Sequence, residues 1–141
     1  MVDLIEDGTL SVELAAYLLV CVSDGASFLT AANPGGAGKS TLLADLLSFL
    51  PPGERIISTS GPQVIVQALR GPPPLPTCIL AHEIGSGHWY GYIWGHDARD
   101  FFRLRPEHRI AACMHADTIE EMGDILLSDP LEVDPDHFGR L

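Results

Sequence analysis

A lysine within a glycine-rich stretch is the residue of this sequence best suited to chemistry. Lys39 is the only lysine among the 141 residues, and Ser40 follows it directly. Glycines let successive backbone N–H groups point at an anion, and a helix that starts there adds its unpaired N–H groups. Lys39 would add a full charge, and the Ser40 hydroxyl would hold Mg²⁺. The residues expected to surround the phosphates are Asn33, Pro34, Gly35, Gly36, Ala37, Gly38, Lys39, Ser40 and Thr41.

The segments on either side of this stretch are those that a phosphate-binding loop requires. An apolar run at 26–32 predicts a strand before it, and an apolar run at 42–50 predicts a helix after it. The full pattern has glycine five positions before Gly38, where this chain has Asn33. Asn tolerates a left-handed backbone better than most residues, so the replacement is compatible with the loop. The alternative is a glycine-rich turn that only joins a strand to a helix.

Two further polar residues follow buried strands and are candidates for the same site. Glu83 comes just beyond a predicted strand at 77–81, and His115 stands at the end of a predicted strand at 109–114. In an open parallel sheet the carboxyl ends of the strands face one crevice, so Lys39, Glu83 and His115 are expected to converge. An acid there would order Mg²⁺ or the attacking water. The alternatives are a solvated loop acid for Glu83 and a helix-start residue for His115.

Hydrophobic periodicity and turn residues predict strands that alternate with helices. Strands are expected at 26–32, 54–58, 77–81 and 109–114, and helices at 11–22, 42–50, 62–69, 98–104 and 118–127. The proline-rich segment 70–76 is expected to be an extended connector. This alternation predicts an α/β fold with a parallel sheet and helices on both faces. Together with the phosphate-loop pattern, it resembles the RecA-like fold of P-loop NTPases.

Bulk composition limits the classes of partner and compartment. The formal net charge of -11 argues against binding to nucleic acid or to an anionic membrane. The chain starts with an acidic segment unlike a signal peptide, and its apolar runs are too short to span a bilayer. Cys21, Cys78 and Cys113 lie in apolar stretches, which is typical of reduced core cysteines. We therefore expect a cytoplasmic protein with one domain over 1–141 and a solvated acidic tail from about 128.

Four stretches resemble the secretion ATPases, the motor family of type II and type IV secretion and of type IV pili. They are the helix at 10–18, the run from Gly38 through 50–56, the strand and glutamate at 79–84, and the segment at 114–117. The resemblance implies that the chain binds ATP and Mg²⁺ and hydrolyses the nucleotide. It also implies that Glu83 polarises water, directly or through Mg²⁺, while His115 contacts the γ-phosphate. A ring-shaped homo-oligomer, or a secretion- or pilus-type protein partner, is implied as well.

The chain departs from that family at positions that matter for hydrolysis. Ser58-Thr59-Ser60-Gly61 stands where the family has an acidic box, and Gly85-Ser86-Gly87 stands where it has arginines. No segment resembles the family's amino-terminal domain. Two alternatives to an ATPase therefore stay open. One is a non-catalytic nucleotide-binding module that switches a partner, and the other is a small-molecule P-loop kinase.

The segment between the third and fourth strands holds other side chains of interest. His82, His88 and His96 do not match a zinc-binding spacing, so no metal site is expected there. The aromatic residues from Trp89 to Phe102 are expected in the core or at a subunit interface rather than as a base-stacking surface. Three arginines nearby are expected in surface ion pairs, with an arginine finger as the alternative. They are Arg99, Arg103 and Arg105.

Overall fold

A computed structural model describes residues 1–104, 107–139 and 141. Five strands are present in this part of the chain: β1 (Phe28–Ala31), β2 (Arg55–Ser58), β3 (Thr77–Ile84), β4 (Tyr92–Ile93) and β5 (Arg109–Met114). The helices are α1 (Val2–Glu6), α2 (Val12–Ser23), α3 (Lys39–Leu47), α4 (Pro62–Ala68), α5 (His96–Phe102), α6 (Ile119–Leu127) and α7 (Pro135–Phe138). The α/β alternation expected from the sequence is confirmed. No helix in the described residues is long and apolar enough to cross a membrane.

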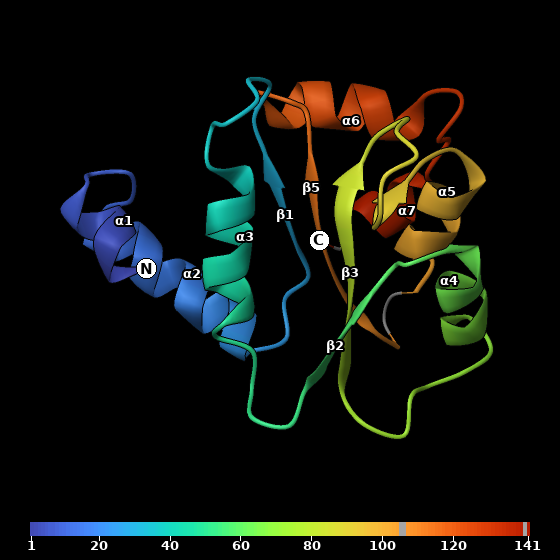
Figure 1. The fold of residues 1–141 in the computed structure, drawn as a ribbon, viewed down its shortest axis with the longest axis horizontal. Helices are drawn as coiled ribbons and strands as arrows, with labels where there is room; N and C mark the ends of the chain where they lie inside the picture. Colours follow the sequence, from blue (N-terminus) through green and yellow to red (C-terminus); the bar gives the residue numbers. More distant parts are fainter. Residues whose placement is uncertain (105–106, 140) are drawn as a thin grey trace.

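All strand pairs in the sheet are parallel, in the order β1-β5-β3-β2, and β4 pairs with the end of β3. The central strand β5 therefore has β1 on one side and β3 on the other. The carboxyl ends of these three strands lie at one edge of the sheet, together with the loop from β1 to α3 and with α6 (Figure 1). This edge is where ligands bind in open α/β sheets.

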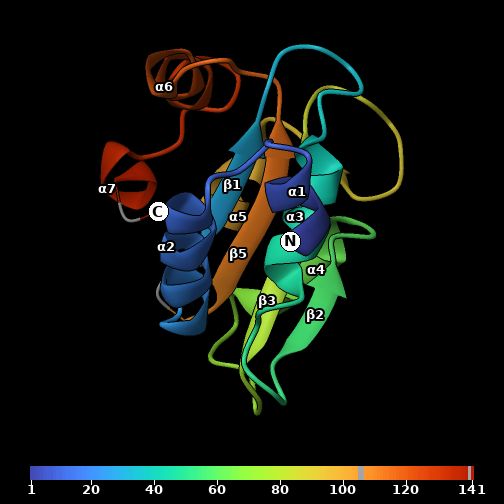
Figure 2. The ribbon, with the colours of Figure 1, turned by 90° about the vertical axis from the view of Figure 1, so that its left-hand side faces the viewer.

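Alternate residues of the buried strands pack on opposite faces of the sheet. On one face, Ile79, Ile110 and Met114 join a large core with side chains from α4, α5 and α6, including the fully buried Phe101 and Phe102. On the other face, a smaller core is centred on side chains of β3, β5 and α3, namely Leu43, Cys78, Ala111 and Cys113. Figure 2 shows α2 beside β1 and α3 on the face of the smaller core. Helices thus cover both faces, as expected.

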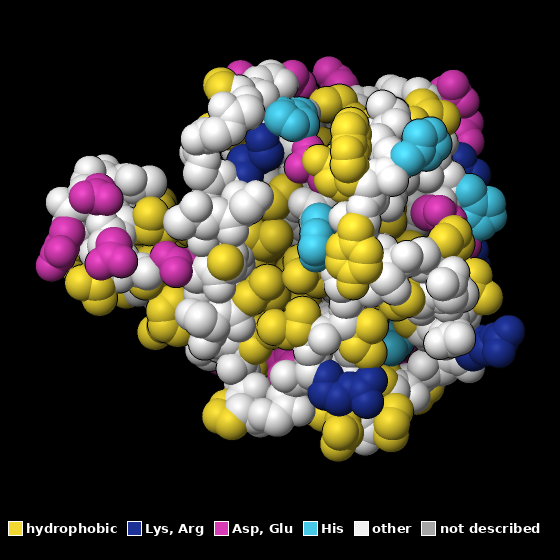
Figure 3. Space-filling model, viewed as in Figure 1, with side chains coloured by type: hydrophobic (Ala, Val, Ile, Leu, Met, Phe, Trp, Pro, Cys, Tyr) yellow, Lys and Arg dark blue, Asp and Glu magenta, His cyan; other side chains and the backbone are white. Residues whose placement is uncertain are grey.

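The smaller-core face is only partly covered. Ile56 of β2 is 49% exposed, and hydrophobic side chains reach the surface between α3 and β2 (Figure 3). Along α2, Val12, Tyr17 and Val20 are also exposed.

A buried ion pair ties the starts of two strands to the end of α2. The Arg109 guanidinium donates to both Glu54 carboxylate oxygens, at 2.8 and 3.1 Å, and each side chain is only 6% exposed. Arg109 also donates to the carbonyl oxygens of Val22 and Ala26. The pair is therefore fully hydrogen-bonded, as a buried charge requires.

Helix ends follow the local signals of the sequence. The Ser11 hydroxyl accepts from the N–H of Leu14, and the Thr118 hydroxyl accepts from the N–H of Glu121. Gly25, just beyond α2, has a positive φ of 98°, which allows the chain to turn into β1. These caps place the two helices close to the bounds predicted for them.

Several bounds differ from those predicted. Strand β3 runs to Ile84 and not to 81, and α3 begins at Lys39, three residues earlier than expected. Three short elements were not predicted, namely α1, β4 and α7. The segment from 128 is also not a free solvated tail, because Leu131 and Val133 are 1% and 2% exposed and belong to the large core. Its carboxylates face solvent while its apolar residues anchor it.

Candidate functional site

The glycine-rich stretch forms an open loop between β1 and α3. Gly36 and Gly38 have positive φ values of 77° and 90°, and nothing lies within 4 Å of the position a Cβ would take at either residue. Their backbone conformation, and not lack of space, therefore calls for glycine. Because α3 begins at Lys39, its unpaired N–H groups face the same opening. A cavity of about 270 Å³ adjoins the loop, lined by Thr30 and Lys39 among others.

Lys39 lies at the mouth of this loop, where a backbone carbonyl accepts a hydrogen bond from it. Its Nζ donates to the carbonyl oxygen of Ala32 at 3.0 Å and lies 3.4 Å from Nδ1 of His115. Beneath it, the Thr30 hydroxyl lies 3.2 Å from Sγ of Cys113. Burial raises the pKa of the Cys113 thiol, and hydrogen bonds to Thr30 and Ser40 oppose that rise. Cys113 is therefore a neutral packing residue under the loop.

His115 connects the loop to the neighbouring strand. It directly follows β5, and its Nδ1 lies 2.7 Å from the carbonyl oxygen of Asn33. Since a carbonyl oxygen only accepts, Nδ1 carries the proton of this hydrogen bond. The other ring nitrogen, Nε2, lies 3.1 Å from Oε1 of Glu83. The ring thus bridges the phosphate-loop candidate and the acid, and α6 begins too late, at Ile119, for His115 to be a helix-start residue.

Glu83 is a strand residue, which corrects the expectation that it follows the strand. It is the next-to-last residue of β3 and is 7% exposed, so it is not a solvated loop acid. The β3–β5 register shifts between Ala81 and Ile84, where β3 has one residue more than β5. Such a bulge re-aims a side chain. Glu83 Oε1 has no partner with hydrogen-bond geometry among the described residues, although His115 Nε2 is near it.

Asn33 is bound to α6 by a network that the sequence did not reveal. Its backbone N–H and its side-chain amide donate to the Asp117 carboxylate at 2.7 and 3.1 Å. The same amide donates to Glu121 at 3.0 Å, and Glu121 also accepts from the N–H of Asp117. The hydrogen bonds from Asn33 and the nearby Lys39 charge hold the pKa of Asp117 below its usual value. The hydrogen bonds from Asp117 and Asn33 likewise lower the pKa of Glu121.

The residues expected to hold Mg²⁺ lie on either side of this opening. Ser40 is exposed in the first turn of α3, and Glu83 faces the site from β3. Within the described residues, no three His, Cys, Asp or Glu side chains gather as metal ligands.

The loop from β3 to β4 covers the other side of Glu83. A second cavity, of about 540 Å³, is lined by Glu83, His115, Trp89 and Trp94 among others. Trp89 packs on Tyr92 with ring centroids 5.2 Å apart, yet it is 71% exposed. The aromatic residues of this segment therefore differ in burial. Phe101 and Phe102 lie in the core, whereas Trp89 and Tyr90 face solvent. The subunit-interface role stays a prediction.

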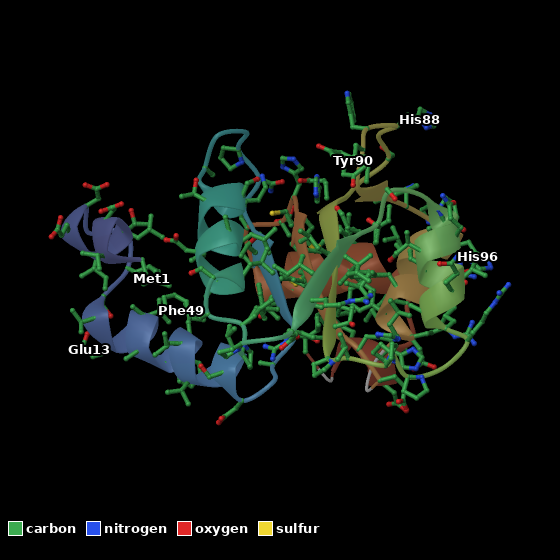
Figure 4. All side chains as sticks on the ribbon, turned by 60° about the horizontal axis from the view of Figure 1, so that its bottom comes forward. Met1, Glu13, Phe49, His88, Tyr90 and His96 are labelled. Atoms are coloured by element: carbon green, nitrogen blue, oxygen red, sulfur yellow. The ribbon has the colours of Figure 1, made fainter. Side chains whose placement is uncertain are left out.

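Other residues singled out in the sequence lie apart from this site or have partners elsewhere. His82 Nε2 is 2.8 Å from the Ser58 hydroxyl, whereas His88 is on the β3–β4 loop and His96 is on α5 (Figure 4). Arg99 is bound to Glu132 and to two backbone carbonyls of the segment after α6, and Arg103 is paired with Asp100. These are the surface ion pairs expected for Arg99 and Arg103. Arg105 lies outside the described residues.

The fold is shared with a solved secretion ATPase. The structure entitled VirB11 ATPase from the Brucella suis type IV secretion system, in complex with sulphate, superposes with a TM-score of 0.65. The chain therefore shares the α/β fold of that ATPase. The match covers 98% of this chain but only 44% of that one, at 17% sequence identity. No sequence model of a known family matches this chain, and no curated protein matches it by sequence.

Proposed function

We propose that this chain binds ATP with Mg²⁺ at residues 33–41 and hydrolyses it, as a relative of the secretion and pilus motor ATPases. The observation that carries the proposal is the position of His115. Its Nδ1 is 3.4 Å from Lys39 Nζ, and its Nε2 is 3.1 Å from Glu83 Oε1. The imidazole thus lies between a cation suited to the phosphates and an acid suited to orienting water.

The proposed binding step replaces contacts within the chain by contacts with the nucleotide. Lys39 exchanges the Ala32 carbonyl for the β- and γ-phosphate oxygens, and the N–H groups of the loop and of the first turn of α3 surround the phosphates. The Ser40 hydroxyl would hold Mg²⁺, which neutralises the phosphate charge. His115 Nδ1 would turn its N–H from the Asn33 carbonyl to the γ-phosphate.

The proposed chemical step uses Glu83. Its carboxylate orients a water molecule whose oxygen bonds to the γ-phosphorus while the bond to the β-γ bridging oxygen breaks. The water proton passes to the carboxylate, and ADP and phosphate leave. Burial of Glu83 beside a cavity supports this role, because a nearly dry carboxylate interacts strongly with a reacting water.

The second candidate function is a nucleotide-binding switch without turnover. The region of the family's acidic box supports it, because Ser58 and Thr59 are bonded to His82 and to the Gly91 carbonyl. The Ser58 hydroxyl thus contacts β3, the Thr59 hydroxyl contacts the β3–β4 loop, and neither supplies a second carboxylate. A homo-oligomer or a secretion- or pilus-type partner belongs to both candidates as a proposal.

Phosphate release from ATP, measured with and without Mg²⁺, tests hydrolysis. Glu83→Gln keeps the shape of the side chain but removes its charge, so we expect turnover to fall about a hundredfold while ATP still binds. Glu120→Gln, on the exposed start of α6, is the matched control and should retain turnover. Equal rates for wild type and Glu83→Gln would remove Glu83 from the mechanism. ATP binding without wild-type turnover would favour the switch.

A further inference from the structure

A cavity of about 380 Å³ lies between the segment that precedes α4, the loop from β3 to β4 and the start of α5. Three aromatic side chains line it, those of Trp89, Tyr92 and Trp94. Its polar lining residues include Asp97, in the first turn of α5, and His88, at the outer end of the loop (Figure 4). No lysine or arginine in the described part of the chain lines it, and none of the residues of the proposed nucleotide site does.

Two of the aromatic rings form adjoining walls and not a parallel stack. The ring centroids of Trp89 and Tyr92 are 5.2 Å apart, and the ring planes are inclined by 59°. A Cβ at Gly87 would lie 2.0 Å from a carbon of the Trp89 ring, so only glycine lets this ring pack directly on the loop. Trp89 is nevertheless 71% exposed. A large ring that is packed against the loop and still exposed is accessible to a ligand.

The Asp97 carboxylate gives this cavity a negative charge. The residue is half-buried, and its side chain has no hydrogen-bond or ion-pair partner among the described residues. The two arginines that follow it on α5 are paired with other carboxylates, Arg99 with Glu132 and Arg103 with Asp100. A cavity with an unpaired carboxylate and no lining lysine or arginine attracts a positively charged ligand and repels an anion.

Aromatic rings select among positively charged groups. The faces of tryptophan and tyrosine rings attract cations, and quaternary ammonium groups are the ligands that aromatic cages recognise. A primary ammonium or a guanidinium carries three to five N–H donors that ring faces satisfy poorly, whereas a trimethylammonium carries none. We propose that this cavity binds a methylated ammonium group, with its methyl groups against Trp89, Tyr92 and Trp94 and its charge near Asp97.

The volume limits what is attached to this group. Pockets for small ligands begin at roughly 300 Å³, so a cavity of about 380 Å³ admits the group together with a short chain. A choline-type small molecule and the side chain of a trimethylated lysine both meet this description. The proposal does not rest on the nucleotide function, because the two sites share no residue.

Two probes that differ only in charge test the proposal on the wild-type protein. Choline is one, and 3,3-dimethylbutanol, which has carbon in place of the charged nitrogen, is the other. The chain has two tryptophans, Trp89 and Trp94, and both line the cavity, so intrinsic fluorescence reports binding. We expect choline to change the emission saturably and the neutral alcohol to bind about tenfold more weakly. Equal affinities of the two probes would overturn the proposal.

A short glycine-rich peptide with one trimethylated lysine distinguishes the two sources of the group, with the unmethylated peptide as its control. Tighter binding of the methylated peptide than of choline would indicate a protein side chain as the ligand, and the reverse order would indicate a small molecule. No saturable binding of choline or of the methylated peptide would overturn the proposal.

Two variants locate the bound cation. Asp97→Asn keeps the shape of the side chain and removes its charge, so choline affinity should fall about three- to fivefold, whereas Asp124→Asn on the exposed side of α6 should not change it. Gly87→Ala should displace the Trp89 ring and weaken choline binding by a similar factor. Lys39→Ala should bind choline as wild type does, whatever its effect on ATP. Choline binding that is unchanged in both Asp97→Asn and Gly87→Ala would place the cation elsewhere and contradict the proposal.

Discussion

The carboxylate of Asp117 accepts hydrogen bonds from both the backbone N–H and the side-chain amide of Asn33, over 2.7 and 3.1 Å. Asn33 occupies the first position of the phosphate-loop pattern, where glycine is usual. A glycine there has no side-chain amide to donate. In this chain the entry to the loop is therefore attached to the segment between β5 and α6.

Asp117→Asn should loosen this attachment, because the side-chain amide presents one acceptor oxygen where the carboxylate presents two. Hydrogen exchange of the Asn33 backbone N–H should become about two- to fivefold faster, the range expected for an exposed charged interaction. Asp124→Asn, on the exposed side of α6, is the control and should not change it. Unchanged exchange at Asn33 in Asp117→Asn would show that the network does not restrain the loop.

Acid should release the same attachment. The pKa of Asp117 is lowered from 3.8 and that of Glu121 from 4.5 in the folded state. When the pKa of a carboxyl group is lower in the folded than in the unfolded state, its charge stabilises the fold. This stabilisation is fully present at pH values above the pKa of the unfolded state, and it is lost as pH falls through the pKa of the folded state. The Asn33 N–H resonance should therefore stay constant from pH 7 to about 5 and titrate with a midpoint below 3.8. A midpoint at or above 3.8 would contradict the contact.

The buried ion pair predicts a large loss of stability from a small change. Glu54→Gln leaves the Arg109 charge buried at 6% exposure without its counter-ion. Breaking such a pair costs about 3–5 kcal/mol of the free energy of unfolding, measured by urea denaturation. The double variant Glu54→Leu with Arg109→Met removes both charges and should recover part of this loss. A Glu54→Gln variant as stable as wild type would show that the pair is not buried as described.

Association is predicted to involve the exposed end of the β3–β4 loop. Trp89 and Tyr90 are 71% and 63% exposed, and Tyr90 follows His88, which lies at the outer end of this loop (Figure 4). Large aromatic residues concentrate at interfaces. Light scattering at tens of micromolar, with and without ATP and Mg²⁺, should show self-association that Trp89→Ser with Tyr90→Ser abolishes. A wild-type protein that stays monomeric in both conditions would remove the ring proposal.

The sequence predicted best those features that depend on local pattern. The six buried residues of β5 had the expected bounds, because a strand buried on both faces is largely apolar, and only its first residue, Arg109, is charged. β3 was predicted too short, because its last residues include the polar His82 and Glu83, and Glu83 is in the strand through pairing with the unpredicted β4. α1 and α7 are too short to be stable alone and form through tertiary contacts, such as Phe138 on the large core.

The candidate site also has contacts that the sequence could predict and contacts that it could not. The approach of His115 to Glu83 follows from adjacent parallel strands that end at one edge, so the order of motifs was enough to predict it. The attachment of Asn33 to Asp117 and Glu121 depends on where α6 starts relative to the loop, which no spacing along the chain reveals. The nearness of Asn33 to the residues at the start of α6 becomes apparent only after the order of the strands in the sheet is known.

Calorimetric titration with ATP and Mg²⁺ of the wild type and of Lys39→Ala tests the central claim most directly. Lys39 is half-buried, and its Nζ donates to the Ala32 carbonyl at the surface of the loop, so its removal should leave the fold intact. We expect wild-type binding that depends on Mg²⁺ and at least a thirtyfold weaker affinity in the variant, or about 2 kcal/mol for a lost charged contact. Arg103→Ala, which removes an exposed charge from another part of the surface, should bind as wild type does. Equal ATP affinity for Lys39→Ala and wild type would contradict the assignment of residues 33–41 as a phosphate-binding loop.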